Sequence, residues 1–148
     1  MELHEMSTHT DEVEQAVAGL FAAYRRLRGR EQQRADEVSG AQLRALDSLA
    51  GVRHATARQL ADFADVTPAT MTGMLDSLEA KGIVRRERGT TDRRTVQVVL
   101  TDKGHEIVEA ARKRWRERWN AALGDLPAQD LQATARALTA VSRMFDEM

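Results

Sequence analysis

The sequence has no cysteine and contains few prolines or aromatic residues. Without cysteine, the 148-residue chain forms no disulfide, no cysteine–zinc site and no thiol-based catalytic or redox centre. Its two prolines and six aromatic side chains favour a helical protein over a β-sandwich or barrel. No apolar run is long enough to cross a bilayer and no secretory leader opens the chain, so we expect a cytoplasmic protein without a membrane anchor.

Sequence motifs of catalysis are also missing. No GxSxG, P-loop or dinucleotide fingerprint occurs. The histidines at 4, 9, 54 and 105 form no HExxH motif and no dense cluster with acidic residues. We therefore expect neither an enzyme nor a protein that needs a metal or another cofactor. Apolar residues, at 42%, suffice for one compact domain, with or without extra helices.

The charges are balanced overall but are unevenly distributed along the chain. The net charge is −1, yet residues 1–24 hold five acidic residues and no Lys or Arg, whereas residues 81–94 hold six basic residues and two acidic ones. A local basic segment in a neutral chain fits an element that faces phosphates. It fits a solvated charged hairpin equally well, and charge alone does not separate the two interpretations.

The hydrophobic pattern begins with a long helix near the N-terminus. Residues 1–9 lack periodicity and are predicted to be a mobile tail. Thr10 can cap a helix that extends into the segment 10–37, with acidic residues in its first turn. Apolar residues recur along this helix at spacings of three and four: Val13, Val17, Leu20, Phe21, Tyr24 and Leu27.

Three further helix starts follow in close succession. Ser39 with Gln42, and Thr56 with Gln59, have the spacing of capping boxes. Thr67 is a good N-cap, and Pro68 fits the first helical position. Two short helices joined by about four residues, the second starting at a capped Thr-Pro, predict a helix-turn-helix.

After Gly82 the hydrophobic period changes from helical to alternating. Residues 83–88 and 95–101 are predicted strands around a polar tip, which makes a hairpin directly after a helix-turn-helix, that is, a wing. Thr101 can cap another long helix, and Gly124 and Pro127 separate it from a last one. That last helix carries the apolar stripe Leu131, Leu138, Val141 and Phe145. The fold class is therefore mostly α with a small β wing.

Four blocks of the sequence resemble the MarR-type winged-helix transcription regulators. They are residues 38–46, 56–61, 67–84 and 92–104, and the Asp-Arg-Arg tip followed by alternating valines and Leu-Thr-x-x-Gly is their most specific part. The resemblance implies a DNA-binding domain at 38–104 and dimerisation helices at 10–37 and 105–148. It implies a homodimer that binds a near-palindromic operator on double-stranded DNA, usually as a repressor, and that is released by a small aromatic or phenolic effector.

The helix that starts at Pro68 is the predicted recognition helix. Its exposed threonines can hydrogen-bond phosphates or bases, and its free N–H groups favour a phosphate. Gly73 stands where many relatives have an arginine. Alternatively, this is an ordinary capped helix whose small residues face water. The predicted DNA-binding residues here are Thr67, Pro68, Ala69, Thr70, Thr72, Gly73 and Ser77.

The wing supplies the predicted backbone and minor-groove contacts. An arginine at a hairpin tip can enter a narrow minor groove, and a nearby carboxylate can hold its guanidinium. The resemblance favours Arg94 for that role and Asp92 as the residue that orients the wing arginines. An exposed ion pair worth little is the competing interpretation. The predicted contacts are Arg58, Arg86, Arg88, Arg93 and Arg94.

Four aromatic residues are candidates for an effector pocket: Tyr24, Phe63, Trp115 and Trp119. Packing against partner helices is the favoured interpretation of the two tryptophans, which lie four residues apart on one face of a helix. The alternative function is a winged-helix protein-interaction module that does not bind DNA. The charge of the wing argues against that alternative, because a protein-binding wing does not need three arginines.

Overall fold

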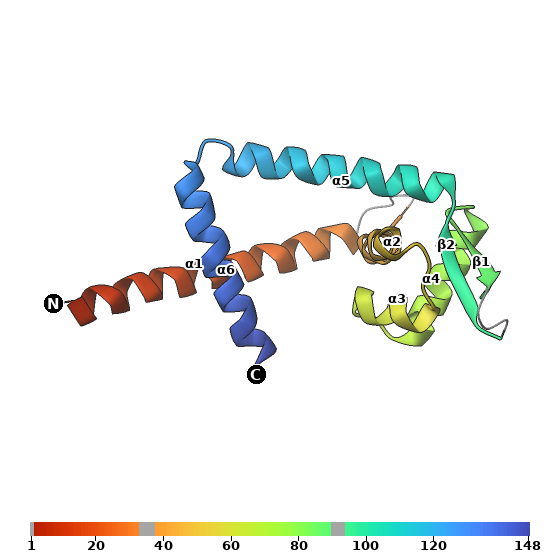
Figure 1. Cartoon of the computed structure of the whole chain (residues 1–148), viewed down its shortest axis with the longest axis horizontal. Helices are drawn as coiled ribbons and strands as arrows, with labels where there is room; N and C mark the ends of the chain where they lie inside the picture. The colour runs from red at the N-terminus through yellow and green to blue at the C-terminus, as the bar shows by residue number, and fades with distance from the viewer. Residues whose placement is uncertain (1, 33–37, 90–93) are drawn as a thin grey trace. The chain divides into compact units, whose positions relative to one another are not determined.

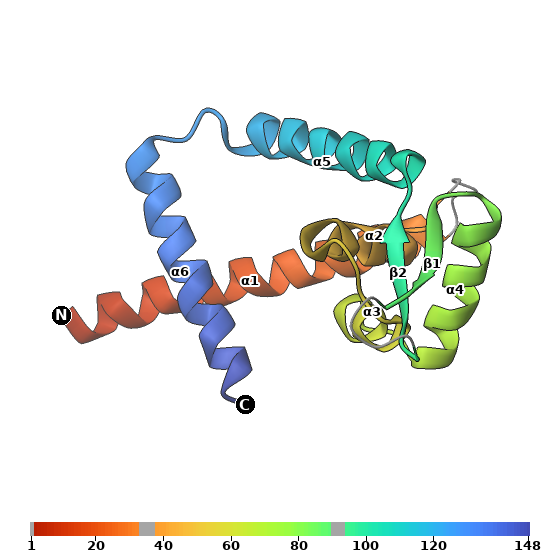
Figure 2. The same cartoon turned by 45° about the vertical axis from the view of Figure 1, so that its right-hand side comes forward.

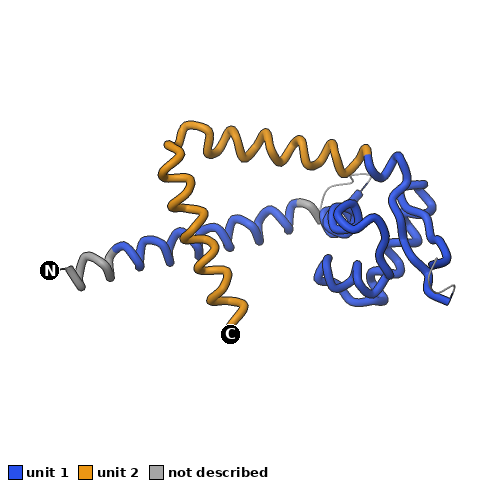
Figure 3. Tube along the Cα trace, viewed as in Figure 1, with its two compact units in different colours: residues 1–105 blue, residues 106–148 orange. Residues whose placement is uncertain are grey.

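The computed structural model describes residues 2–32, 38–89 and 94–148 of the chain. Within these residues the order of elements is α1 (Glu2–Gln32), α2 (Gly40–Val52), α3 (Ala57–Ala64), α4 (Pro68–Ala80), β1 (Val84–Arg88), β2 (Val96–Leu100), α5 (Asp102–Leu123) and α6 (Ala128–Asp146) (Figure 1). The chain divides into two compact units, Met1–His105 and Glu106–Met148 (Figure 3). The first unit contains the helix-turn-helix and its wing, which confirms the predicted fold class.

Three helices of the first unit, α2, α3 and α4, begin where the sequence predicts them. Ser39 and Thr56 each form a complete capping box, in which the hydroxyl accepts from the backbone N–H three residues on. Thr67 caps α4 in the same way, with Pro68 in the first turn. The helix that begins at Ser39 ends one residue later than its predicted stop at Gly51. Local hydrogen bonds therefore fix three helix starts in the DNA-binding region.

The turn between α3 and α4 is closed by backbone hydrogen bonds alone. Asp65 has a left-handed conformation (φ 53°, ψ 52°), and its N–H donates to Asp62 O. The N–H of Val66 donates to Ala61 O at 3.1 Å. These two bonds satisfy carbonyls at the end of α3 and reverse the chain within three residues. The start of α4 is thereby held against the preceding helix.

The wing is a two-stranded antiparallel hairpin, and Figure 2 shows it alongside α4. Val84 pairs with Leu100 and Arg88 with Val96. Ala55, in the link between α2 and α3, adds a single bridge to Val98. The core beneath these elements contains Leu46, Leu49, Leu60, Met71, Leu75, Leu78, Ile83, Val84 and Val98.

The first helix differs from its prediction. It begins at Glu2 instead of Thr10, so the prediction of a non-helical segment before Thr10 is wrong from Glu2 onward. Glu, Leu and Met are strong helix formers, and neither Gly nor Pro interrupts residues 2–9. His9 Nδ1 lies 3.5 Å from Glu12 Oε2, a contact between one turn and the next that spans the predicted start. The high helix propensity of residues 2–9 therefore accounts for the earlier start of α1.

The start of α5 is fixed to the end of α4 through Thr101 and Gly104. The Thr101 hydroxyl lies 2.6 Å from Gly82 O and 3.0 Å from Ile83 O, and it accepts from the Gly104 N–H. Gly82 has φ +69°, a conformation that glycine adopts at little cost. A Cβ on Gly104 would collide with the backbone oxygen of Ile83. The Leu-Thr-x-x-Gly motif is thus explained by a close approach of two backbone segments.

We expect Gly104→Ala to lower the free energy of unfolding by about 1–3 kcal/mol, because the added methyl group overpacks a site bounded by backbone. Urea denaturation of the purified chain measures this change. Gly51→Ala is the matched control, since a Cβ at Gly51 meets nothing within 4 Å and alanine favours a helix. Equal stabilities of the two variants would contradict the close approach.

The second unit consists of most of α5 and all of α6. The helix after Thr101 ends at Leu123, and Gly124 and Pro127 lie between it and α6, as the sequence predicts. None of the residues of α6 is buried. Among the described residues, no helix combines the length and the apolar character that crossing a membrane requires.

Candidate nucleic-acid interface

The outward face of α4 is a surface of small residues at the start of the helix. Met71, Leu75 and Leu78 are buried, and this fixes which side of α4 faces outward. Ser77 is half-buried beside that surface. The other predicted contacts on the recognition helix are all exposed: Thr67, Pro68, Ala69, Thr70, Thr72 and Gly73. One helix end therefore brings the predicted recognition residues together.

The hydroxyl groups on this surface hydrogen-bond to their own helix. Thr67 Oγ1 accepts from the Thr70 N–H at 3.2 Å and lies 2.9 Å from Thr70 Oγ1. Thr72 Oγ1 donates to Pro68 O at 3.0 Å. The first turn of α4 presents the Ala69 N–H and small side chains together, since Pro68 has no N–H and the Thr70 N–H is bonded to Thr67 Oγ1.

The wing is tied to α4 by Arg86, at the centre of β1. Its Nη2 lies 2.6 Å from Asp76 Oδ1, and its Nη1 lies 2.5 Å from Glu79 Oε2. The other oxygen of Glu79 accepts from the Arg86 backbone N–H at 3.0 Å. The hydrogen bond to Asp76 contributes most to raising the pKa of Arg86 above its usual value, and that to Glu79 adds to it, against partial burial, which lowers the pKa. We call these three residues the wing clamp.

The wing clamp changes the role that the sequence predicts for Arg86. The sequence predicts Arg86 as a DNA-backbone contact, whereas its guanidinium, with 28% of the side chain exposed, binds two carboxylates of α4. Sequence reasoning missed Asp76 and Glu79. Their spacing of three on one side of α4 is the signal that could have found them, since such residues are neighbours on a helix surface.

The remaining wing arginines differ in their surroundings. Arg85 Nε donates to Glu87 Oε1 at 2.6 Å within the same strand. Arg88, at the end of β1, is exposed, and so is Arg94, two residues before β2. Asp92 and Arg93, predicted as the orienting carboxylate and as a wing contact, lie outside the described residues. Arg88 and Arg94 therefore lie at the tip end of the described hairpin.

One further predicted contact and a hollow lie in the helix-turn-helix. Arg58 is exposed in the first turn of α3. A hollow of about 470 Å³ at the turn is lined by Ala61, Asp62, Asp65, Val66 and Thr67. Across the residues that the structure describes, no three His, Cys, Asp or Glu side chains are grouped so that they could hold a metal ion.

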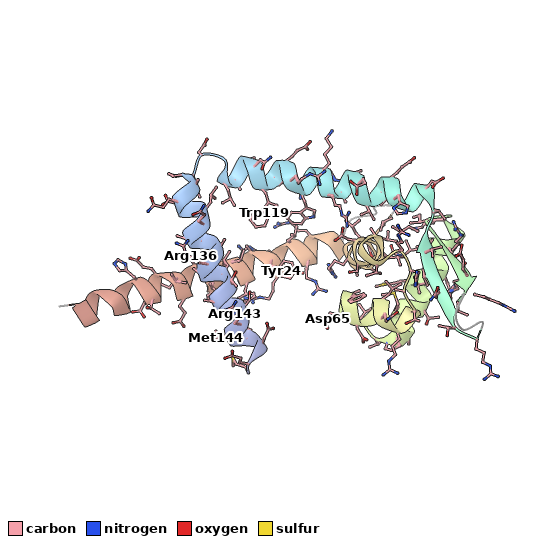
Figure 4. The ribbon with its side chains drawn as sticks, viewed as in Figure 1. Tyr24, Asp65, Trp119, Arg136, Arg143 and Met144 are labelled. Atoms are coloured by element: carbon pink, nitrogen blue, oxygen red, sulfur yellow. The ribbon has the colours of Figure 1, made fainter. Side chains whose placement is uncertain are left out.

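The four residues predicted for an effector pocket belong to different units. Tyr24 on α1 and Phe63 on α3 lie in the first unit, and Trp115 and Trp119 on α5 lie in the second. All four are exposed, and Figure 4 labels Tyr24 and Trp119. The guanidinium carbon of Arg28 lies 6.0 Å from the centroid of the Tyr24 ring. A shared pocket stays a prediction.

Comparisons with known proteins agree with this architecture. Residues 38–96 match the model of the MarR family. The chain is 41% identical over 95 residues to the uncharacterized HTH-type transcriptional regulator ML2140 of Mycobacterium leprae, covering 64% of each chain. It is 36% identical over 85 residues to the HTH-type transcriptional repressor MdtR of Bacillus subtilis, covering 55% of each. The matches thus span between half and two thirds of these relatives.

Solved structures of other proteins share the fold of this chain over most of their own length. The Streptococcus pneumoniae protein FabT, whose crystal structure is in complex with DNA, superposes with a TM-score of 0.76 at 21% identity. This comparison covers 90% of the present chain and 97% of FabT. The winged helix that residues 38–96 form is therefore similar to that of the MarR family.

Proposed function

We propose that this protein is a transcription regulator that binds double-stranded DNA as a homodimer, with one winged helix on each half of a near-palindromic operator. The observation that carries the proposal is the exposed, capped start of α4 beside a basic hairpin that is fastened to the same helix. The positive end of a helix dipole suits a phosphate, and arginines on a hairpin suit phosphates and a minor groove. The FabT complex with DNA supports this use of the fold.

Within that function the wing arginines have different roles. We assign contacts with phosphates or the minor groove to Arg94 and Arg88, which are exposed at the tip end of the described hairpin. Arg86 is a positioning residue, because its charge is bound by Asp76 and Glu79 and it fastens the hairpin to α4. The clamp therefore sets the distance between the two DNA-reading elements.

Dimerisation is supported by the exposed apolar residues of α1 and α6. Val13, Leu20 and Phe21 of α1 are exposed, as are Leu138 and Phe145 of α6. Monomeric proteins rarely expose contiguous apolar surface of this kind. A second copy of the chain covers such faces by symmetry, because a two-fold interface uses the same patch on both subunits.

Repression and release by a small aromatic or phenolic effector belong to the same proposal. The name of MdtR as a repressor supports the first part. The exposed tyrosine and tryptophans, with Arg28 over Tyr24 and Arg118 over Trp115, offer aromatic surface next to positive charge for the second. A winged helix that binds only protein would select no DNA sequence.

We expect Arg94→Ala to weaken binding to the operator and to lower the salt slope of log K by up to about one phosphate equivalent in each half-site of the dimer. The operator is first obtained by selecting bound duplexes from a random pool with the full chain. Affinity is then measured by fluorescence anisotropy across a series of salt concentrations. Arg85→Ala is the control, since Arg85 is paired with Glu87 on the same hairpin. A salt-independent interaction, or no selection of any sequence, would refute DNA binding.

A further inference from the structure

The outward face of α4 lacks the side chains that read purines in the major groove. Between Thr67 and Ala80 the sequence contains no Arg, Lys, Asn or Gln. Arg and Lys pair with guanine, and Asn and Gln pair with adenine. The acidic residues of the helix, Asp76 and Glu79, are bound to Arg86. Recognition by α4 must therefore depend on its small residues.

Thr72 presents a methyl group more readily than a hydroxyl. Its hydroxyl hydrogen is donated to Pro68 O at 3.0 Å, one turn back along the helix. That bond satisfies the one donor of the side chain and fixes its rotamer. The residue is exposed, so its methyl group is the part of the side chain that remains for a partner. Ala69, one turn earlier, is also exposed and apolar.

Gly73 gives an independent indication of a close partner. A glycine inside a helix costs about 1 kcal/mol relative to alanine. The fold does not require it, since a Cβ at Gly73 would meet nothing within 4 Å and its φ is not positive. A glycine without an internal role suits a position where another molecule approaches the backbone closely. The edge of a base pair in the major groove is such a molecule.

We propose that α4 reads thymine, by apolar contact of the C5 methyl group with Ala69 and with the Thr72 methyl, at a base step that Gly73 lets the helix approach. This inference rests on the proposed DNA-binding function and adds the sequence class of the operator. The half-site then has a thymine at each position that Ala69 or Thr72 contacts, and strong guanine readout by this helix is absent.

The first test removes only the methyl group from the DNA. In the selected operator, each thymine under α4 is replaced by deoxyuridine, which keeps the Watson–Crick and groove hydrogen bonds. We expect about fourfold weaker binding for each thymine that is read in one half-site, the effect of one buried methyl-sized group. Deoxyuridine outside the footprint of α4 is the control and should leave the affinity unchanged.

The second test removes the methyl group from the protein. Thr72→Ser keeps the hydroxyl and its bond to Pro68 but lacks the methyl group, whereas Thr72→Val keeps a methyl group and lacks the hydroxyl. At the thymine that Thr72 contacts, we expect the serine variant to bind the thymine duplex and the deoxyuridine duplex with equal affinity. We expect the valine variant to retain the fourfold preference. Thermal unfolding of both variants confirms that the helix is intact.

The outcomes separate this inference from the function on which it rests. Salt-dependent, sequence-selective binding without any deoxyuridine effect, or a selected half-site rich in G·C under α4, overturns thymine readout and leaves the regulator function standing. A full thymine preference in the serine variant overturns the role of Thr72. Absence of sequence-selective binding to any duplex refutes the DNA-binding function and the inference together.

Discussion

Replacing Glu79 by glutamine is expected to weaken operator binding about tenfold, although it removes a negative charge from the face proposed to meet DNA. Glu79 holds the backbone N–H of Arg86 with one oxygen and the guanidinium with the other. A glutamine amide has one acceptor oxygen, and its NH₂ group would meet the donors of Arg86. The hairpin is then held less firmly against α4.

The tenfold figure follows from two equal losses in a dimer. A partly exposed ion pair contributes about 0.2–1 kcal/mol, so we take about 0.7 kcal/mol for each clamp. Losses in both half-sites add to about 1.4 kcal/mol, which is a factor of ten in the dissociation constant. Fluorescence anisotropy on the selected operator measures the change, and the salt slope should stay that of the unmodified protein.

The direction of the change in DNA affinity distinguishes a positioning role of Glu79 from simple repulsion between its charge and DNA. Glu87→Gln removes the same charge from the same hairpin but leaves the wing clamp complete, because Glu87 pairs only locally with Arg85 in the described contacts. We expect that control to bind DNA as well as the unmodified protein or slightly better. If Glu79→Gln also bound DNA more tightly, the clamp would have no part in positioning the wing.

A charge on the apolar face of α6 is expected to produce a monomer that binds the operator at least about 100-fold more weakly. Leu138 is 40% exposed on that face. In a two-fold interface Leu138→Asp introduces two carboxylates into apolar surface, which costs several kcal/mol unless they are paired. A monomer engages one half-site and loses the contacts of the other.

Sedimentation at micromolar concentration measures the oligomeric state, and the same samples serve for operator titrations. Ala140→Asp is the matched control, because residue 140 lies on the opposite side of the same exposed helix. It should sediment as a dimer and bind the operator as the unmodified chain does. A stable folded monomer of the unmodified protein at this concentration would refute the dimer.

The parts of the fold that depend on short-range hydrogen bonds could be predicted from the sequence. Ser39 and Thr56 cap their helices through residues three positions away, so each signal is complete within four residues. The wing could be predicted for a similar reason, since its strands are joined by a short tip. The start of α1 could not, because strong helix formers before Thr10 continued the helix where no cap marks its beginning.

The site shows the limit of that reasoning more clearly. An arginine in a basic hairpin looks like a phosphate contact when the strand is considered alone. Its partners, Asp76 and Glu79, lie ten and seven residues earlier on a different element, and only the packing of the strand against α4 brings them to Arg86. Whether a basic residue is available to DNA depends on such pairings between elements, which a sequence pattern does not contain.

The helix caps of the first unit have a chemical consequence. Ser39, Thr56, Thr67 and Thr101 all cap with a hydroxyl. Aspartate or asparagine would cap about as well, but an aspartate gains a proton in acid. A hydroxyl does not ionise in the physiological pH range, so acidification of the surroundings leaves these four helix starts unchanged. Any response of the regulator to acid must therefore originate in side chains other than these caps.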